Sequence, residues 1–84
     1  MKVSEKGHSV TIKDTQGDFS TFLMKLTNQY KAFEPLNIIV DLSKYSDLSI
    51  TDIKSLSLLS KQHKKAKKSF VIVVLNIDYN AVPD

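Results

Sequence analysis

The stretch Leu36-Asn37-Ile38-Ile39-Val40-Asp41-Leu42 decides the fold class, because its residues are almost continuously apolar and many are β-branched. A strand with one wet face alternates apolar and polar residues, whereas a continuous run is typical of a strand buried on both faces. The later stretch Phe70-Val71-Ile72-Val73-Val74-Leu75 has the same character. The two stretches predict two doubly buried strands of one sheet.

The segment between these stretches predicts a helix that begins near residue 50. Ser49 is followed three residues later by Asp52, which comes close to a capping box. Apolar positions then recur at helical spacing, at Ile53, Leu56, Leu59 and His63 or Ala66, with Leu58 beside them. A strand-helix-strand unit of this kind crosses over with a right hand in about 98% of cases and makes the two strands parallel.

The first third of the chain predicts a hairpin and another helix. Val3 and Glu5, then Val10 and Ile12, belong to two short strands joined at Gly7. Asp18 predicts the N-cap of a helix, and Glu34-Pro35 its end, because the residue before a proline is pushed out of the α region. One apolar stripe of this helix faces the sheet: Phe19, Phe22, Leu23, Leu26, Tyr30 and Phe33.

The pattern therefore predicts a single α/β domain over residues 1–84. It has an N-terminal β-hairpin, a β-α-β unit and a mixed sheet with helices packed on it. Residues 76–84 show no clear periodicity, so we expect one face of the sheet to lack cover. A partner protein or a second copy in a homodimer would cover this face, unless the chain is a shortened one.

Composition narrows the class of protein. With 84 residues the chain forms one domain, and without cysteine it has neither a disulfide scaffold nor a thiolate metal site. The N-terminus has no apolar signal region, and the longest apolar run is far shorter than the roughly twenty residues that span a bilayer. We expect a cytoplasmic protein without membrane association.

A hydroxyl-rich segment after the first buried strand is the main candidate site. A phosphate added at a helix N-terminus meets free amides and the positive end of the helix dipole, and brings about −1.5 to −2 charges to the surface. Ser49 and Thr51 are the candidate phosphorylation sites, although capping and solvent contact alone also explain these hydroxyls. The predicted partner-binding residues are Ser43, Ser46, Asp47, Ser49, Thr51, Asp52 and Ser55.

Two other classes of function stay open. A cluster of cations at the end of the second helix could bind nucleic acid or another polyanion, although the helix dipole alone favours cations there and no aromatic residues interleave with them. All twelve basic residues of the chain are lysines, and the lack of arginine forks weighs against nucleic-acid readout. The cluster consists of Lys61, Lys64, Lys65, Lys67 and Lys68.

The third class is an enzyme with Mg²⁺ held by Asp41, Asp47 and Asp52, and it is the least favoured of the three. The sequence has no GxGxxG, phosphate-loop, GxSxG or HExxH motif. His8 and His63 lie on different predicted elements, and we interpret His63 as a helix-surface residue. We predict that the protein is not an enzyme and needs no cofactor or metal.

The order of these elements resembles the STAS domain, the module of anti-sigma-factor antagonists and sulfate-transporter tails. The resemblance covers about residues 10–76 and rests on Gly17-Asp18-Phe19, on the strand ending in Asp41-Leu42-Ser43, and on the helix and strand that follow. It implies a STAS-like fold that lacks the family's final strand and helix. It also implies a role in bacterial signal transduction and transcription regulation, with a kinase-like anti-sigma factor as the partner.

In that family a serine at the helix start is phosphorylated by the partner kinase, which breaks the contact. The family's Asp-Ser-Ser-Gly aligns with Ser49-Ile50-Thr51-Asp52. The usual acceptor position therefore falls on Ile50, which cannot be phosphorylated, and Thr51 matches the second hydroxyl. A shift of one residue would put Ser49 at the acceptor position.

Overall fold

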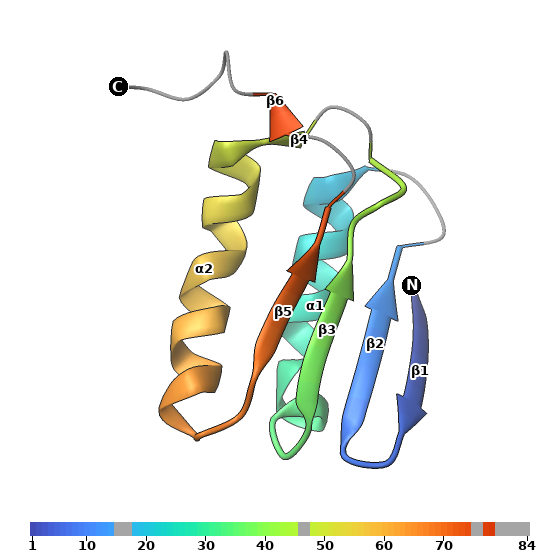
Figure 1. Cartoon of the computed structure of the whole chain (residues 1–84). Coiled ribbons are helices and arrows are strands. Elements are labelled where there is room, and N and C mark those ends of the chain that lie inside the picture. Colours follow the sequence, from blue (N-terminus) through green and yellow to red (C-terminus); the bar gives the residue numbers. More distant parts are fainter. Residues whose placement is uncertain (15–17, 46–47, 75–76, 79–84) are drawn as a thin grey trace.

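Pairs of consecutive strands alternate with single helices along the chain in a computed structural model that describes residues 1–14, 18–45, 48–74 and 77–78. In Figure 1 one helix lies behind the four-stranded main sheet and the other stands beside its margin. In chain order the elements are β1 (Lys2–Lys6), β2 (Ser9–Lys13), α1 (Phe19–Phe33), β3 (Asn37–Asp41), β4 (Leu48–Ser49), α2 (Ile50–Lys65), β5 (Phe70–Val73) and β6 (Ile77–Asp78).

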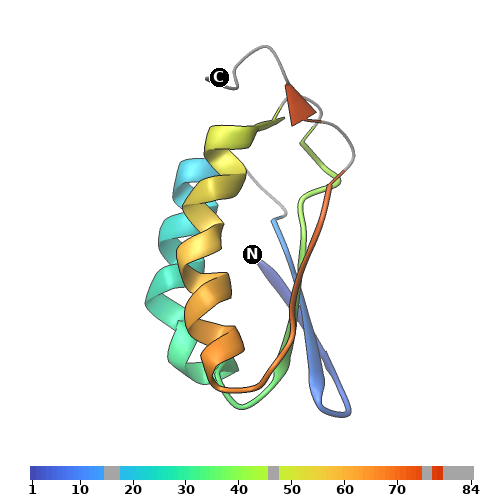
Figure 2. The same ribbon diagram turned by 60° about the vertical axis from the view of Figure 1, so that its left-hand side comes forward.

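The main sheet has the order β1-β2-β3-β5, with β1 antiparallel to β2 and the other neighbours parallel. The chain steps in the same direction across the sheet from β2 to β3 and from β3 to β5. Crossovers of one hand that step in one direction place their helices on the same face. Figure 2 shows this two-layer arrangement, with α1 and α2 side by side on one side of the sheet. The predicted α/β fold, with its N-terminal hairpin and mixed sheet, is confirmed.

Both helices begin where local signals in the sequence predict it. The Asp18 carboxylate accepts the Thr21 N–H at 2.8 Å and caps α1. At the start of α2, the Ser49 hydroxyl oxygen accepts the Asp52 N–H, and the Asp52 carboxylate accepts the Ser49 N–H, both at 3.2 Å. This reciprocal pair is a complete capping box.

The end of α1 lies where the sequence predicts it, but for another reason. Glu34 keeps helical dihedrals, with φ −55° and ψ −38°, so Pro35 does not push it out of the α region. Proline has no N–H, and its ring prevents the helix from continuing. The chain then turns, and the Leu36 N–H donates to the Phe33 carbonyl at 2.9 Å.

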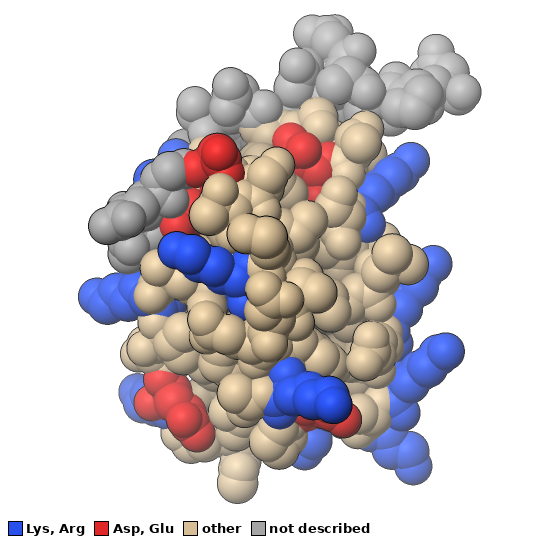
Figure 3. Space-filling view, turned by 180° about the vertical axis from the view of Figure 1, so that it is seen from behind, with Lys and Arg blue, Asp and Glu red and all other residues tan. Residues whose placement is uncertain are grey.

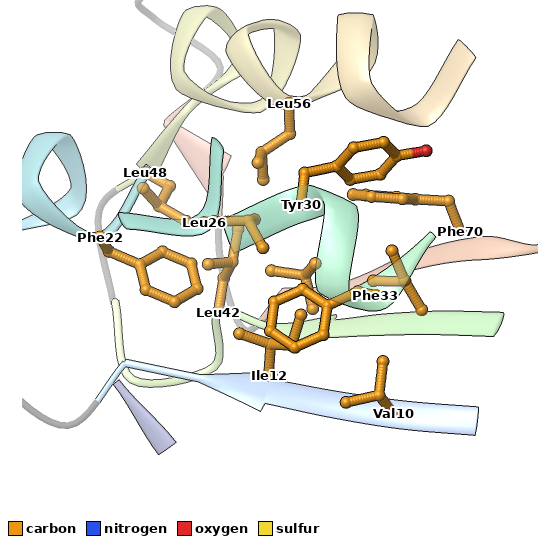
Figure 4. Packing of buried hydrophobic residues seen from close by; sticks show 12 residues of the cluster. Val10, Ile12, Phe22, Leu26, Tyr30, Phe33, Leu42, Leu48, Leu56 and Phe70 are labelled. Atoms are coloured by element: carbon orange, nitrogen blue, oxygen red, sulfur yellow. The ribbon is translucent and has the colours of Figure 1, made fainter. Parts of the chain in front are cut away.

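The hydrophobic core fills the space between the two helices and the covered face of the sheet (Figure 4). The register aligns Val10 with Ile38 and Phe70 across the three parallel strands, so their side chains share that face. The fully or nearly fully buried members are Val10, Ile12, Phe22, Leu26, Tyr30, Phe33, Ile38, Val40, Leu42, Leu48, Leu56 and Phe70.

The prediction that the central strands are buried on both faces is wrong. On the face opposite the helices, Val71 is 48% and Val73 is 42% exposed, and Ile39 is half-buried. Both crossovers run over one side, so no helix in the described part of the chain covers the other side (Figure 2). The expectation that one face lacks cover is confirmed for these residues. We call this surface the open face.

The interpretation of His63 as a surface residue is also wrong, because His63 is fully buried. Its Nε2 lies 2.6 Å from the Leu36 carbonyl oxygen, and its Nδ1 lies 2.7 Å from the Tyr30 hydroxyl. A carbonyl only accepts, so Nε2 carries the proton and the Tyr30 hydroxyl donates to Nδ1. Tyr30 and Phe70 each form a T-shaped ring contact with the imidazole. His63 therefore occupies a core position of the α2 stripe, whereas Ala66 is exposed.

A second, very short sheet joins β4 to β6. Leu48 pairs with Ile77 and Ser49 with Asp78 in a parallel arrangement. Two-residue strands are too short to show a period, which explains why the sequence pattern does not reveal them. Neither helix of the described chain combines the length and apolar character needed to cross a membrane.

Candidate functional site

The predicted partner-binding residues extend from the end of β3 to the second turn of α2. Ser43, Ser49, Thr51, Asp52 and Ser55 are described, whereas Ser46 and Asp47 lie outside the described residues. The structure divides the described residues into two groups: some side chains hold the backbone in place, and others are presented to the solvent.

Ser43 belongs to the first group. Its N–H and its hydroxyl both donate to Oδ1 of Asp41, at 2.9 and 2.5 Å. The Lys13 ammonium lies 3.7 Å from Oδ2 of the same carboxylate. The hydrogen bonds from the Ser43 hydroxyl and backbone, together with Lys13, hold the pKa of Asp41 below its usual value. The pair forms a local turn that begins the loop after β3.

Tyr45 fixes the same loop from its other side. Its hydroxyl donates to Oδ2 of Asp14, at the end of β2, and its ring packs edge-on against Phe19 with 5.9 Å between centroids. Burial, followed by the hydrogen bond to Asp14, raises the pKa of Tyr45. Sequence reasoning missed this contact, because no local pattern links two residues that are 31 positions apart.

The start of α2 contains both groups of residues. Ser49 and Asp52 are half-buried and form the capping box, so their side chains serve the helix itself. Thr51 and Ser55 are exposed, and the Ser55 hydroxyl donates to the Thr51 carbonyl at 3.3 Å. The hydroxyl surface available to a partner therefore centres on Thr51 and Ser55.

The three carboxylates of the magnesium hypothesis do not form a common site in the described chain. Asp41 binds Ser43 and Lys13, Asp52 caps α2, and Asp47 lies outside the described residues. Among the side chains that are described, no three potential ligands gather around one point. The described residues therefore provide no arrangement of side chains that supports the magnesium hypothesis.

The lysine cluster surrounds the opposite end of α2. Lys61, Lys64, Lys65 and Lys67 are exposed, and Lys68 is half-buried. The helix closes with the Ala66 and Lys67 N–H groups donating to the His63 and Lys64 carbonyls, and Lys67 has a left-handed φ of 63°. Figure 3 shows basic side chains along the edge of the molecule that α2 forms. A 16-residue helix is about 24 Å long, so the cluster is well separated from Thr51.

A shallow polar hollow of about 270 Å³ lies on the open face and was not foreseen. Strand register creates it, since Lys2 pairs with Lys13 and Lys13 pairs with Asp41. The alternating residues of β1 and β2 indicate which side chains share a face of each strand. Combining them into one hollow requires the order of the strands in the sheet. The hollow is lined by Lys2, Ser4, Thr11, Lys13 and Asp41.

Comparison with known proteins gives no match: no family model matches the chain, and neither does any curated protein or solved structure. The resemblance to STAS domains stays a prediction that rests on the residues quoted for it.

Proposed function

We propose that this chain is a non-catalytic regulatory module that binds a protein partner through the exposed start of α2. The observation that supports this proposal most is that the side chains at that helix end fall into two groups, one that caps the helix and one that is exposed. Ser49 and Asp52 hold the first turn rigidly, while Thr51 and Ser55 point to the solvent. A preorganised helix end with exposed polar side chains loses little conformational freedom when a partner docks.

The same geometry favours Thr51 over Ser49 as a phosphorylation site. The Ser49 hydroxyl oxygen accepts the Asp52 N–H, so a phosphate there would disrupt the cap and lie beside the Asp52 carboxylate. Thr51 is the second residue of α2 and is exposed, so its phosphate could reach the free amides of the first turn. Such a phosphate would add repulsive charge to the contact surface without unfolding the helix.

The resemblance to STAS domains suggests a kinase-like anti-sigma factor as the class of partner. Phosphorylation of Thr51 by such a partner would then release the complex. The charge introduced at the interface accounts for release by desolvation and repulsion, and no catalytic group of this chain takes part.

The test compares Thr51→Glu with Gln62→Glu in affinity capture from the source cells, with quantitative mass spectrometry. Both positions are exposed on α2, and both changes add one negative charge, at opposite ends of the helix. We expect a partner that wild type and Gln62→Glu retain and Thr51→Glu loses. A set of bound proteins that is the same for all three forms would remove the helix start from the interface.

The lysine cluster supports a second candidate function, binding of a nucleic acid or another polyanion. Four exposed ammonium groups at one helix end form a concentrated positive surface. If this is the function, affinity for an RNA oligonucleotide falls linearly in log salt, and Gln62→Glu weakens binding more than Thr51→Glu. Absence of binding at low salt would dismiss this candidate.

A further inference from the structure

The two edges of the main sheet differ in charge. The β1 edge carries Lys2, Glu5 and Lys6, and charged side chains of this kind deter pairing with another strand. The β5 edge reads Phe70-Val71-Ile72-Val73 and contains no charged residue. By composition, β5 is the edge that is open to strand addition.

The hydrogen bonds show which groups of β5 face away from the sheet. The Ser69 and Val73 carbonyls accept N–H groups of Ile38 and Leu42, so these residues point their backbone groups toward β3. Because backbone groups alternate along a strand, those of Phe70 and Ile72 point outward. In the part of the chain that the structure describes, β5 pairs with β3 alone.

The described part of the chain places no strand beyond this edge. Figure 1 shows α2 outside the β5 edge, with no described strand in front of it. Ile53 of α2 and Ile72 of β5 are only half-buried although both pack against the core. A strand added to β5 would lie under α2 and complete the burial of this margin.

The geometry favours a lone extended segment over a second copy of the whole chain. Antiparallel pairing of β5 with β5 would relate the two copies by an axis perpendicular to the sheet, which keeps both helix layers on the same side. The α2 of each copy, which lies beyond its own β5 edge (Figure 1), would then extend over the face of the other copy that helices already cover (Figure 2). An extended segment without a helix beside it avoids this clash.

Charge specifies the segment further. Lys64, Lys67 and Lys68 stand at the end where β5 begins, whereas Asp41 and Asp52 lie toward the end where the strands finish. A complementary segment has acidic residues at the end next to the lysines and none at the other end. We propose that the β5 edge binds an extended, apolar, acid-ended peptide segment of a partner protein by adding it as a fifth strand to the sheet.

Two synthetic peptides test this proposal with the 84-residue chain. Both contain five alternating Val and Thr residues, and one has two Glu residues at its N-terminus for parallel addition, the other at its C-terminus for antiparallel addition. Matched controls carry Lys in place of Glu or a central Pro, which removes a backbone donor. We expect one Glu peptide to bind, at least about tenfold weaker binding of its Lys version, and loss of binding with Pro.

Amide hydrogen exchange measured by NMR locates the binding. When peptide fills about nine tenths of the sites, exchange at the Ile72 amide should slow about tenfold, because only the free tenth exchanges. The Val71 and Val73 amides already face β3 and should change little. Binding that leaves the Ile72 amide unprotected, or failure of both Glu peptides to bind, would overturn the proposal.

A variant pair provides an independent check. Lys64→Glu with Lys67→Glu reverses two exposed charges beside the β5 edge, and Lys25→Glu with Lys31→Glu makes the same change on exposed positions of α1. The first pair of changes should weaken binding of the Glu peptide at least about tenfold, and the second pair should weaken it much less. Equal losses in the two pairs would mean that net charge, and not this edge, attracts the peptide.

Discussion

The two faces of the main sheet differ sharply although the same strands form both. On the covered face, Ile38 and Val40 are fully buried under the helices. On the open face, the neighbouring Ile39 is half-buried, and Val71 and Val73 are nearly half exposed. An apolar run thus identified central parallel strands correctly, but the number of covered faces depended on where the crossovers ran.

The largest expected effect comes from a charge on the covered face. Val40→Asp places a carboxylate without a partner in the core and should cost on the order of 5 kcal/mol, comparable to the whole stability of a small domain. Circular dichroism and the amide NMR spectrum should report an unfolded chain. Val71→Asp, on the open face, should remain folded, and unfolding of both variants would contradict the difference between the faces.

Adjacent isoleucines test the same difference with a milder change. Ile38→Ala leaves a cavity in the core and should lower the free energy of unfolding by about 2–5 kcal/mol. Ile39→Ala removes the same atoms from the half-buried side and should cost about 1 kcal/mol or less. Urea denaturation of the two variants measures both values, and similar losses would show that the open face is covered in solution.

The next largest effect on stability is expected at the hydrogen-bonded pair of Tyr30 and His63 inside the core. Tyr30→Phe removes the hydroxyl that donates to His63 Nδ1 and leaves that buried nitrogen without a donor. The free energy of unfolding should fall by about 1–3 kcal/mol. A double-mutant cycle with His63→Leu, which also removes the donor to the Leu36 carbonyl, gives the coupling energy between the two side chains. An unchanged stability of Tyr30→Phe would show that the pair contributes nothing.

The smallest effect is expected at Asp41 on the open face, and it depends on pH. The pKa of Asp41 is lowered on folding, so its ionised form stabilises the fold above the usual value of 3.8, and this contribution disappears as pH falls through the lowered pKa. Asp41→Asn should therefore cost about 1 kcal/mol or less near neutral pH, with the difference from wild type shrinking in acid. Urea midpoints from about pH 7 to about pH 3 measure this trend, and a difference that grows in acid would contradict it.

Much of the candidate site was predictable because its signals are local. The spacing of Ser49 and Asp52 predicted the capping box, and Asp18 predicted the start of α1. The bond from Tyr45 to Asp14 and the hollow beside Lys13 have no such local signal, since they join residues from different strands and loops. Which hydroxyls are exposed also required the structure, because Ser43 and Thr51 look alike in the sequence.

The sequence by itself determined both helices, the longer strands and the α/β class, because periodicity, caps and prolines act over a few residues. Only the tertiary structure decided that both helices lie on one face, that His63 is a core residue and that β5 is an uncharged edge beside α2. Those features depend on the order in which strands pair and on the direction of each crossover. Order and direction are properties of the assembled sheet, and no short stretch of residues contains them.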